Sequence, residues 1–512
     1  MIDVLYNTSM DANAIKELRQ RLQESQTQFG ARFSVSQITV AHWESGRSKP
    51  MSKRLLEIQD LSRMPTASAT APRPFRPIQY LGSKLRLAET IATIIEQVAP
   101  RSCRVGDLFS GTGVVSSAIA VSHPVTAVDI QSYSAVLSAA RLRSSARHFS
   151  ELLKPEFEHR AREVESQLGR ALAPLISVEQ DAIAEAKEGR TTLLAELIEH
   201  GSLAVFEQRP AATISSYLES ALKSSSRNLK RLGLSTADTT ALRYFGGPYF
   251  SYPQAIALDS ILIASTDFKN HSTALAVILS AASEMVNTVG KQFAQPMKLR
   301  KADGTTPEIL LQRAIRDRSL DTFHVFSSWA SRWYAHTLKP SKEHKVVCGD
   351  VLDFVSQDES CRAWYADPPY TIDHYSRFYH VLETISLRDS PKLDEMAKRG
   401  EITVMRGVYR GGRYQSPFCI PSKAHSAFDG LFSATAKNGA PLVLSYSPYD
   451  EAQGNRPRLL TLKEMMDIAS KYYRNVSLEE IDEHSHRKLN SKSLNSGIRS
   501  NAECLIICEA AR

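Results

Sequence analysis

The segment Ala363-Trp-Tyr-Ala-Asp-Pro-Pro-Tyr370 constrains the fold of this chain more than any other feature. Its apolar first half has the composition of a buried strand, and two prolines follow almost directly. Because proline lacks the N–H that a strand ladder needs, the chain has to leave the sheet at the carboxyl end of this strand. In doubly wound α/β sheets, ligands bind at that edge. The segment therefore predicts a buried strand that ends beside a ligand site.

Helix and strand patterns alternate on both sides of this segment. Before residue 140 we expect a helical apolar face over 84–98, a strand over 103–109, a helix over 114–121 and a strand over 125–130. The α/β alternation returns over 345–354, 441–445 and 504–508. Strand–helix–strand units favour a parallel sheet covered by helices, so we predict an α/β fold.

Composition divides the rest of the chain. Residues 64–74, MPTASATAPRP, read as a linker. Residues 140–235 and 254–287 have helical spacing with few strand signals, which predicts a mostly helical insertion. The predicted domains are a small all-α unit over 1–63, the linker, the first half of the α/β domain over 75–139, the insertion over 140–344 and the second half over 345–512.

A chain of 512 residues suits two to four domains. We expect a cytoplasmic protein without a membrane partner, because the N-terminus lacks the pattern of a secretory signal and no apolar run is long enough for a membrane span. The net charge of +8 weakly favours an anionic partner. Six scattered cysteines complete no zinc pattern, so we expect buried reduced thiols and no metal site.

The turn after the strand at 103–109 carries the second functional signal. Gly111 and Gly113 let the backbone approach a ligand closely, and the helix that follows offers free N–H groups to it. Asp129, at the end of the next strand, is placed to bind ribose hydroxyls, and Ile130 offers an apolar face to an adenine ring. The alternative is a plain tight turn. The third glycine of a dinucleotide fingerprint is missing, which disfavours NAD.

Asp-Pro-Pro-Tyr fits the activation of an exocyclic amino group. The lone pair of such a nitrogen is delocalised into the base, and two acceptors placed against its N–H bonds would free it. Asp367 supplies a carboxylate, the carbonyl of Pro368 supplies a second acceptor, Pro369 rigidifies the turn and Tyr370 offers a ring for base stacking. The target base must first leave the duplex. The alternative is a strand-ending turn with an accidental Asp and Tyr.

These motifs resemble the D12-class, Dam-like α-group of N6-adenine DNA methyltransferases. Gln79-Tyr-Leu-Gly-Ser-Lys84 is similar to the family's motif X, Asp107-Leu-Phe-Ser-Gly-Thr-Gly113 to motif I and Asp367-Pro-Pro-Tyr370 to motif IV. The segments His374–Glu383 and Val443–Ser447 also look like parts of this family. The resemblance implies a Rossmann-like class I sheet and S-adenosylmethionine as cofactor. The cofactor residues that it implies, together with those of the glycine turn, are Tyr80, Gly82, Lys84, Asp107, Phe109, Gly111, Gly113, Asp129, Ile130, Asp350 and Val351.

The resemblance implies methylation of adenine N6 in a specific duplex DNA sequence, with target recognition in the insertion. Two segments there, 243–249 and 291–298, interleave basic and aromatic residues; DNA contact and ordinary packing are equally open for each. A cytosine-N4 methyltransferase is the second hypothesis, although serine is more usual there than Asp367. An RNA methyltransferase is less favoured. A DNA-binding regulator with an inactive methyltransferase domain is the third.

Residues 13–63 resemble a helix-turn-helix of the Xre/Cro type, with helices near 25–33 and 37–44 joined by a short turn. The residues expected to face DNA are Gln37, Thr39, His42, Arg47 and Lys49, whereas Trp43 is expected in the core. A small helical docking domain is the alternative. The unit either adds DNA affinity or represses the enzyme's own operon. A nuclease motif is not evident, so a restriction or defence subunit is expected to be a separate chain.

Overall fold

The computed structural model describes residues 11–21, 25–33, 35–51, 54–55, 58, 75–210, 214–266, 271–338, 341, 343–398, 401–447, 458–481 and 503–511. The predicted linker over 64–74 lies outside these residues.

Among the described residues, one sheet of seven strands organises the fold. Its strands in chain order are β1 (Arg104–Leu108), β2 (Val125–Asp129), β3 (Lys345–Cys348), β4 (Cys361–Ala366), β7 (Leu442–Tyr446), β8 (Tyr473–Ile481) and β9 (Glu503–Ala511). They lie in the order β3-β2-β1-β4-β7-β9-β8. The first five strands of that order pair in parallel, and β9 runs antiparallel to both β7 and β8. The predicted α/β fold with a mostly parallel sheet is confirmed.

Alternate residues of the strands pack on opposite faces of the sheet. One face is covered by α5 (Ala88–Val98) and α6 (Val114–Ile119), which pack against Val105, Ala127 and Ala363. The other face is covered by α18 (Val351–Gln357), α21 (Pro421–Ala436) and α22 (Leu462–Tyr472). On this second face the indole of Trp364 lies across β1, where a Cβ on Gly106 would stand 2.4 Å from it. Only glycine fits at that point of the neighbouring strand.

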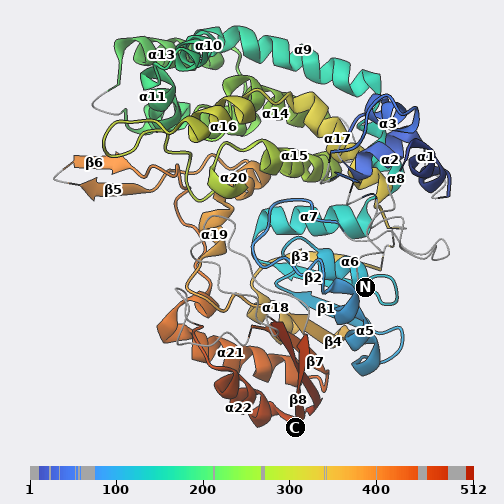
Figure 1. Cartoon of the computed structure of the whole chain (residues 1–512). Coiled ribbons are helices and arrows are strands. Elements are labelled where there is room, and N and C mark those ends of the chain that lie inside the picture. The colour runs from blue at the N-terminus through green and yellow to red at the C-terminus, as the bar shows by residue number, and fades with distance from the viewer. Residues whose placement is uncertain are drawn as a thin grey trace, which may run out of the picture.

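A helical layer lies above the sheet in Figure 1 and contains much of the hydrophobic core. Its helices are α8 (Ala146–Glu151), α9 (Pro155–Ala171), α10 (Ala173–Lys187), α11 (Thr192–His200), α12 (Leu203–Gln208), α13 (Ser216–Arg231), α14 (Tyr252–Ser265), α15 (His271–Met285), α16 (Glu308–Arg318) and α17 (Thr322–Ala335). Short helical turns add η1 (Ala237–Thr239), η3 (Val289–Lys291) and the π-helix η2 (Ala241–Phe245).

Two helices connect this layer to the sheet. α7 (Ser132–Arg143) packs against β2 and β3 on one side and against α15 on the other. α20 (His380–Leu387) contacts both α7 and α15, and it follows the short helix α19 (Tyr375–Phe378). The carboxylate of Glu383 accepts the N–H groups of Ser132 and Tyr133 at 3.0 and 3.1 Å, so α20 fixes the start of α7. The carboxylate also suits the positive end of the helix dipole.

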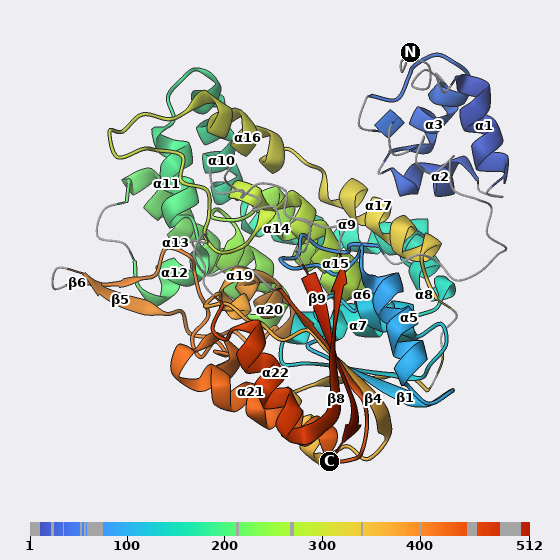
Figure 2. The same cartoon turned by 60° about the horizontal axis from the view of Figure 1, so that its bottom comes forward.

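Two further elements follow α20. The hairpin of β5 (Glu395–Lys398) and β6 (Glu401–Val404) extends outward from the helical layer in both views (Figures 1 and 2). The turn η4 (Pro417–Cys419) returns the chain to the sheet and leads into α21.

Within the described part of residues 11–58, the helices α1 (Ala12–Arg21), α2 (Gln26–Arg32) and α3 (Gln37–Glu44) precede the α/β domain. They group at one corner of the molecule in Figure 2, where α2 also contacts α17. Their apolar side chains form a small core of their own, made of Ile15, Leu18, Phe29, Phe33, Val40, Trp43 and Ile58. Trp43 is buried in this core, as predicted.

Most predicted elements are present with small shifts. Two expectations need correction, and the strands β5, β6 and β8 had no prediction. The helix expected from residue 84 begins at Ala88, because Lys84 turns into a cavity instead of continuing the helical face. The strand β8 was missed, because an edge strand rich in charged residues gives little apolar signal. Cys103 is half-buried and Cys348 is exposed at the end of β3, so the expectation of buried thiols is wrong for these two.

None of the helices that the structure describes is both long enough and apolar enough to cross a membrane.

Candidate active site

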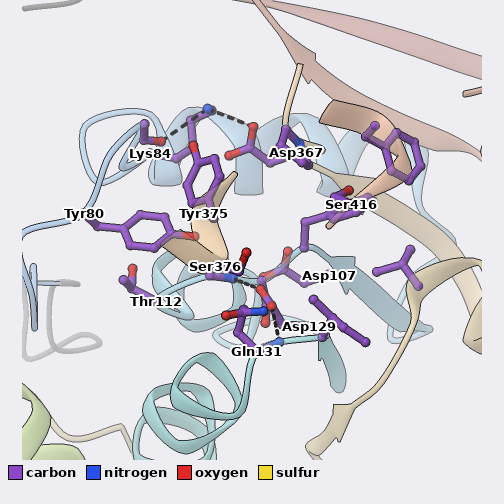
Figure 3. A pocket seen from close by; sticks show the side chains of 18 of the residues that line it. Tyr80, Lys84, Asp107, Thr112, Asp129, Gln131, Asp367, Tyr375, Ser376 and Ser416 are labelled. Atoms are coloured by element: carbon purple, nitrogen blue, oxygen red, sulfur yellow. Dashed lines mark hydrogen bonds and ion pairs between the residues drawn. The ribbon is translucent and has the colours of Figure 1, made fainter. Parts of the chain in front are cut away.

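A cavity of about 1010 Å³, part of it open to solvent, lies at the carboxyl ends of β1, β2 and β4. This is the edge of the sheet at which the sequence predicted a ligand site. Figure 3 shows Lys84 and Asp367 at one end of the cavity, and Asp129 and Gln131 at the other. Its wall therefore combines segments that lie far apart in the sequence.

The turn between β1 and α6 forms the floor of the cavity. Gly111 and Gly113 have φ of 52° and 67°, in the left-handed region that favours glycine. A Cβ on Gly111 would stand 2.9 Å from the hydroxyl of Tyr80 across the cavity. Phe109 also has a positive φ of 62°, which is strained for a bulky side chain, and its ring packs edge-on against Phe418. The turn thus holds a backbone conformation that leaves room for a ligand.

Asp129 lies at the end of β2 and binds this turn. Its Oδ2 accepts the N–H of Gly111 and its Oδ1 the N–H of Gln131, both at 2.9 Å. Burial raises the pKa of its carboxyl group, and the backbone N–H groups oppose that rise. The hydroxyl of Ser134 and the N–H of Ile130 also act on this carboxylate and lower its pKa. The carboxylate still lines the cavity, where a ligand hydroxyl can reach it.

At the other end of the cavity, Asp367 leaves β4 and meets Lys84. The ammonium of Lys84 lies 2.9 Å from Oδ1 of Asp367 and 3.2 Å from Oε1 of Glu503 on β9. Burial alone would lower the pKa of Lys84, but these two carboxylates hold it well above its ordinary value. Lys84 is therefore a cation buried between two acids.

Asp107 and Tyr365 face one another across β1 and β4 and line the cavity between these two ends. Burial raises the pKa of Asp107 to about 7; Asp367 adds to the rise, while the hydroxyl of Ser116 donates to its carboxylate and opposes it. A neutral and an ionised Asp107 are both accessible near pH 7.

Asp350 forms the side of the cavity beyond Asp129. One oxygen caps α18 through the N–H of Leu352 at 2.9 Å, and the other accepts the hydroxyl of Tyr414 at 2.8 Å. Val351, Ser416 and Cys419 extend this wall.

A cluster of tyrosines holds the loop before α5. Tyr80 stacks on Tyr379 with ring centroids 5.1 Å apart. The hydroxyl of Tyr379 accepts the N–H of Leu81 at 2.7 Å, and that of Tyr375 donates to the carbonyl of Leu81 at 3.4 Å. The segment after the Pro-Pro turn thus sets the position of Tyr80 and Lys84.

Four polar atoms in the cavity wall have no hydrogen-bond partner within the described part of the chain: Ser83 Oγ, Gln131 Oε1, Tyr365 OH and His374 Nδ1. Unpaired buried polar groups are costly, and a polar ligand would satisfy them. No group of three His, Cys, Asp or Glu among the described residues is placed to hold a metal ion.

Comparison with known proteins agrees with this geometry. Residues 80–172 match the family model of the D12 class N6 adenine-specific DNA methyltransferases. The matched range contains Tyr80, the glycine turn and Asp129, whereas Asp367 lies outside it.

A curated protein also matches part of the chain. The modification methylase LlaI of Lactococcus lactis subsp. lactis is 32% identical over 131 residues, which is 25% of this chain and 18% of that protein. The chain thus spans about a fifth of the length of this relative.

The cavity brings together nearly all of the residues predicted for the cofactor. Those that line it are Tyr80, Gly82, Lys84, Asp107, Phe109, Gly111, Asp129, Ile130, Asp350 and Val351. Gly113 lies at the start of α6, beneath the wall. Of the predicted catalytic residues, Asp367 and Pro369 line the cavity, whereas Pro368 and Tyr370 do not.

Tyr370 lies beside the cavity with its ring in contact with other side chains. Tyr446 meets it edge-on, and the guanidinium of Arg458 lies 4.5 Å from its centroid. Base stacking on Tyr370 stays a prediction.

Sequence reasoning missed several residues of this site. Glu503, Gln131, Tyr133, Tyr414 and Ser416 carry no local motif, and the fold alone brings them to the cavity or to Lys84. Tyr365 lies within the segment 363–370 but was not expected in the site. Tyr375 and Glu383 lie in the segment His374–Glu383, whose resemblance to the methyltransferase family could have pointed to them.

The residues predicted to face DNA lie on and after α3. Gln37, Arg47 and Lys49 are exposed, whereas Thr39 and His42 are half-buried. The two basic and aromatic segments of the insertion, 243–249 and 291–298, are less exposed than the three exposed residues at the cations Arg243 and Lys291. Arg243 is 5% exposed and pairs with Glu207 at 2.8 Å, and Lys291 pairs with Asp317 at 2.9 Å. For these two cations the structure favours ordinary packing.

Proposed function

We propose that this chain transfers a methyl group from S-adenosylmethionine to the N6 amino group of an adenine flipped out of a specific duplex DNA sequence. One observation carries the proposal: Asp367 of Asp-Pro-Pro-Tyr and the Gly111–Asp129 pair line opposite ends of one cavity. An activated amino group and a methyl donor would thus meet between them. The order of the motifs along the chain favours the Dam-like α-group.

The cavity fits the cofactor. Asp129 lines the cavity at the point where ribose hydroxyls would bind, Ile130 and Phe109 supply apolar surface, and Gln131 and Ser83 present unpaired polar atoms. When bound, S-adenosylmethionine supplies an electrophilic methyl group on a sulfonium.

The chain's own residues orient and polarise the amino group. The carboxylate of Asp367 accepts one N–H of the amino group, and the Pro368 carbonyl is the proposed second acceptor. Held in this way, the nitrogen loses conjugation with the ring and its lone pair becomes available. Orientation at near-attack distance and a fixed negative charge beside the nitrogen supply the rate enhancement. We assign residues 75–139 to cofactor binding, 140–344 to target recognition and 345–512 to catalysis.

The test is single-molecule sequencing of genomic DNA from cells that express the wild type or Asp367→Asn. N6-methyladenine in one short motif, present with the wild type and lost with the variant, is the expected result. Asp373→Asn, a matched change outside the cavity, should leave methylation intact. N4-methylcytosine would transfer the proposal to the cytosine class, and an unmodified genome in every sample would refute it.

The relative is named a modification methylase, and we infer a role in restriction–modification or phage defence for this chain as well. Its partners would then be double-stranded DNA and a separately encoded restriction or defence subunit. Co-purification of the chain with proteins encoded beside it tests the second partner.

We further propose that residues 1–63 form a helix-turn-helix unit of the Xre/Cro type that places α3 in a major groove. Gln37 is exposed at the start of α3, and the neighbouring Ile38, 68% exposed, offers an apolar surface for a thymine methyl group. Arg47 and Lys49 follow as phosphate contacts. Footprinting on the chain's own promoter separates operon repression from added affinity for methylation sites.

A further inference from the structure

His374 lies on the loop between the Pro-Pro turn and α19, and it lines the cavity together with Pro369 and Tyr375. The neighbouring Tyr375 lies beside Lys84 at the Asp367 end of the cavity (Figure 3). Because consecutive Cα atoms are about 3.8 Å apart, His374 belongs to the same end. The loop therefore brings an imidazole to the part of the cavity proposed for the target base.

The backbone around His374 is held on both sides. Before it, the carbonyl of Asp373 accepts the S–H of Cys419, with 3.3 Å between sulfur and oxygen. After it, the hydroxyl of Tyr375 donates to the carbonyl of Leu81 at 3.4 Å. The imidazole is thus presented from a loop whose two ends are anchored to the cavity wall.

The imidazole of His374 is not used to hold the described part of the chain together. His374 is the N-cap residue of α19, but its side chain forms no capping hydrogen bond. Its Nδ1 is buried and has no hydrogen-bond partner among the described residues. By contrast, the Nδ1 atoms of His123 and His344 bond to backbone atoms of other segments at 3.0 and 3.1 Å. A buried polar atom without a partner is costly, so this nitrogen is suited to bind a ligand.

The proposed substrate offers a matching group at this end of the cavity. When the amino group of adenine faces Asp367, the ring nitrogens N1 and N7 lie on either side of that amino group, and both are hydrogen-bond acceptors. A neutral imidazole carries one N–H, which can donate to such a nitrogen. In cytosine the amino group has a ring nitrogen on one side and a C–H on the other, so a bond to N7 would also favour adenine.

We propose that His374 recognises the target base by donating its imidazole N–H to a ring nitrogen, N1 or N7, beside the amino group of adenine. This contact turns the base so that its amino group faces Asp367. The inference rests on the proposed function and deepens it, because it assigns base recognition to a side chain outside the Asp-Pro-Pro-Tyr motif.

The test compares adenine with two analogues at the target position of a duplex that carries the motif found by genomic sequencing. 7-Deazaadenine and 1-deazaadenine replace N7 and N1 by C–H and keep the amino group. With one of them, kcat/KM of the wild type should fall about 5- to 100-fold, the range for the loss of one partner of a buried hydrogen bond. His374→Ala should lose a similar factor on adenine and then methylate that analogue as well as it methylates adenine. Because both enzymes meet the same duplex, altered base pairing of the analogue cancels in this comparison.

Two further variants separate recognition from folding. His374→Asn retains an amide that can donate from near the position of Nδ1, so it should keep more activity than His374→Ala. His425→Ala, the same change at an exposed position of α21, is the matched control and should behave as the wild type. Binding of S-adenosylhomocysteine by calorimetry and the melting temperature should stay close to those of the wild type in all three variants.

Two outcomes would overturn the inference. One is a wild type that methylates both analogues as well as adenine, a result that needs no variant. The other is a His374→Ala protein that remains as sensitive to the analogue as the wild type. A wild type that methylates no adenine in genomic DNA would instead refute the proposed function, and the inference with it.

Discussion

Replacing Asp129 by asparagine should weaken cofactor binding for a reason that can be worked out from two hydrogen bonds. The carboxylate accepts the N–H of Gly111 and the N–H of Gln131, one on each oxygen, both at 2.9 Å. Asparagine has a single acceptor oxygen, so in either amide orientation one of these N–H groups faces an NH₂ group. The glycine turn and the start of α7 can then no longer be held together.

The loss can be given a magnitude. A hydrogen bond to a charged group contributes about 1.5–3 kcal/mol, and about 1.4 kcal/mol corresponds to a tenfold change in affinity. If the cofactor binds only the intact turn, Asp129→Asn should raise the Kd for S-adenosylhomocysteine about 10- to 150-fold. Isothermal titration calorimetry measures this Kd without any need for methylation.

A matched control separates cofactor binding from folding. Asp358 accepts the N–H groups of Ser360 and Cys361 at 3.1 and 2.8 Å, just before β4 and outside the cavity. Both N–H groups reach the same oxygen, so Asp358→Asn can keep both hydrogen bonds. This variant makes the same chemical change away from the cavity and should leave the Kd within about twofold, well below one decade of affinity. The reasoning fails if Asp129→Asn binds as the wild type does, or if Asp358→Asn weakens binding equally.

Three further predictions concern stability, read as melting temperature by calorimetry. Gly106→Ala should destabilise the sheet by about 1–3 kcal/mol through overpacking, because the new Cβ would stand 2.4 Å from Trp364; an unchanged melting temperature would contradict the tight packing. Glu383→Gln should lower the melting temperature by removing an acceptor and a charge from the start of α7, and an effect no larger than that of an exposed Glu→Gln change would refute this. Burial raises the pKa of Asp259 to about 7, so the folded chain holds a proton that the unfolded chain releases, and this group's contribution to stability falls as pH rises from about 4 to 7. The wild-type melting temperature should therefore fall between pH 5 and pH 8, which lie about one unit or more from the pKa values of the unfolded and folded chain, and Asp259→Asn should make this fall smaller. An identical fall in both proteins would contradict the raised pKa of Asp259.

The sequence predicted the parts of the site whose signals are local. The β1–α6–β2 unit carries its glycines, its apolar runs and Asp129 within one short stretch, and the Pro-Pro pair marks the end of β4 directly. Backbone chemistry alone therefore placed Asp129 and Asp367 at the same edge of a sheet.

The rest of the site depends on contacts between distant segments. Glu383 contacts the N–H of Tyr133, and Tyr379 contacts Leu81, across sequence separations of 250 and 298 residues. Glu503 lies on an antiparallel strand whose register with β7 has no signature in the sequence. Lys84 was predicted both as the start of a helix and as a cofactor residue, but its contacts with two acids have no local pattern.

The strand order has a consequence for synthesis of the chain. β1 ends at Leu108, but its neighbour β4 begins at Cys361, and β9, which covers the edge of β7, begins at Glu503. At about 5–20 residues per second, the ribosome would present the β1–β2 pair long before its outer neighbours β4 and β3 emerge. Unpaired strand edges attract other chains, so nascent copies should depend on chaperones during this interval. A message truncated before codon 503 would yield a chain with an open sheet edge, prone to aggregation rather than merely inactive.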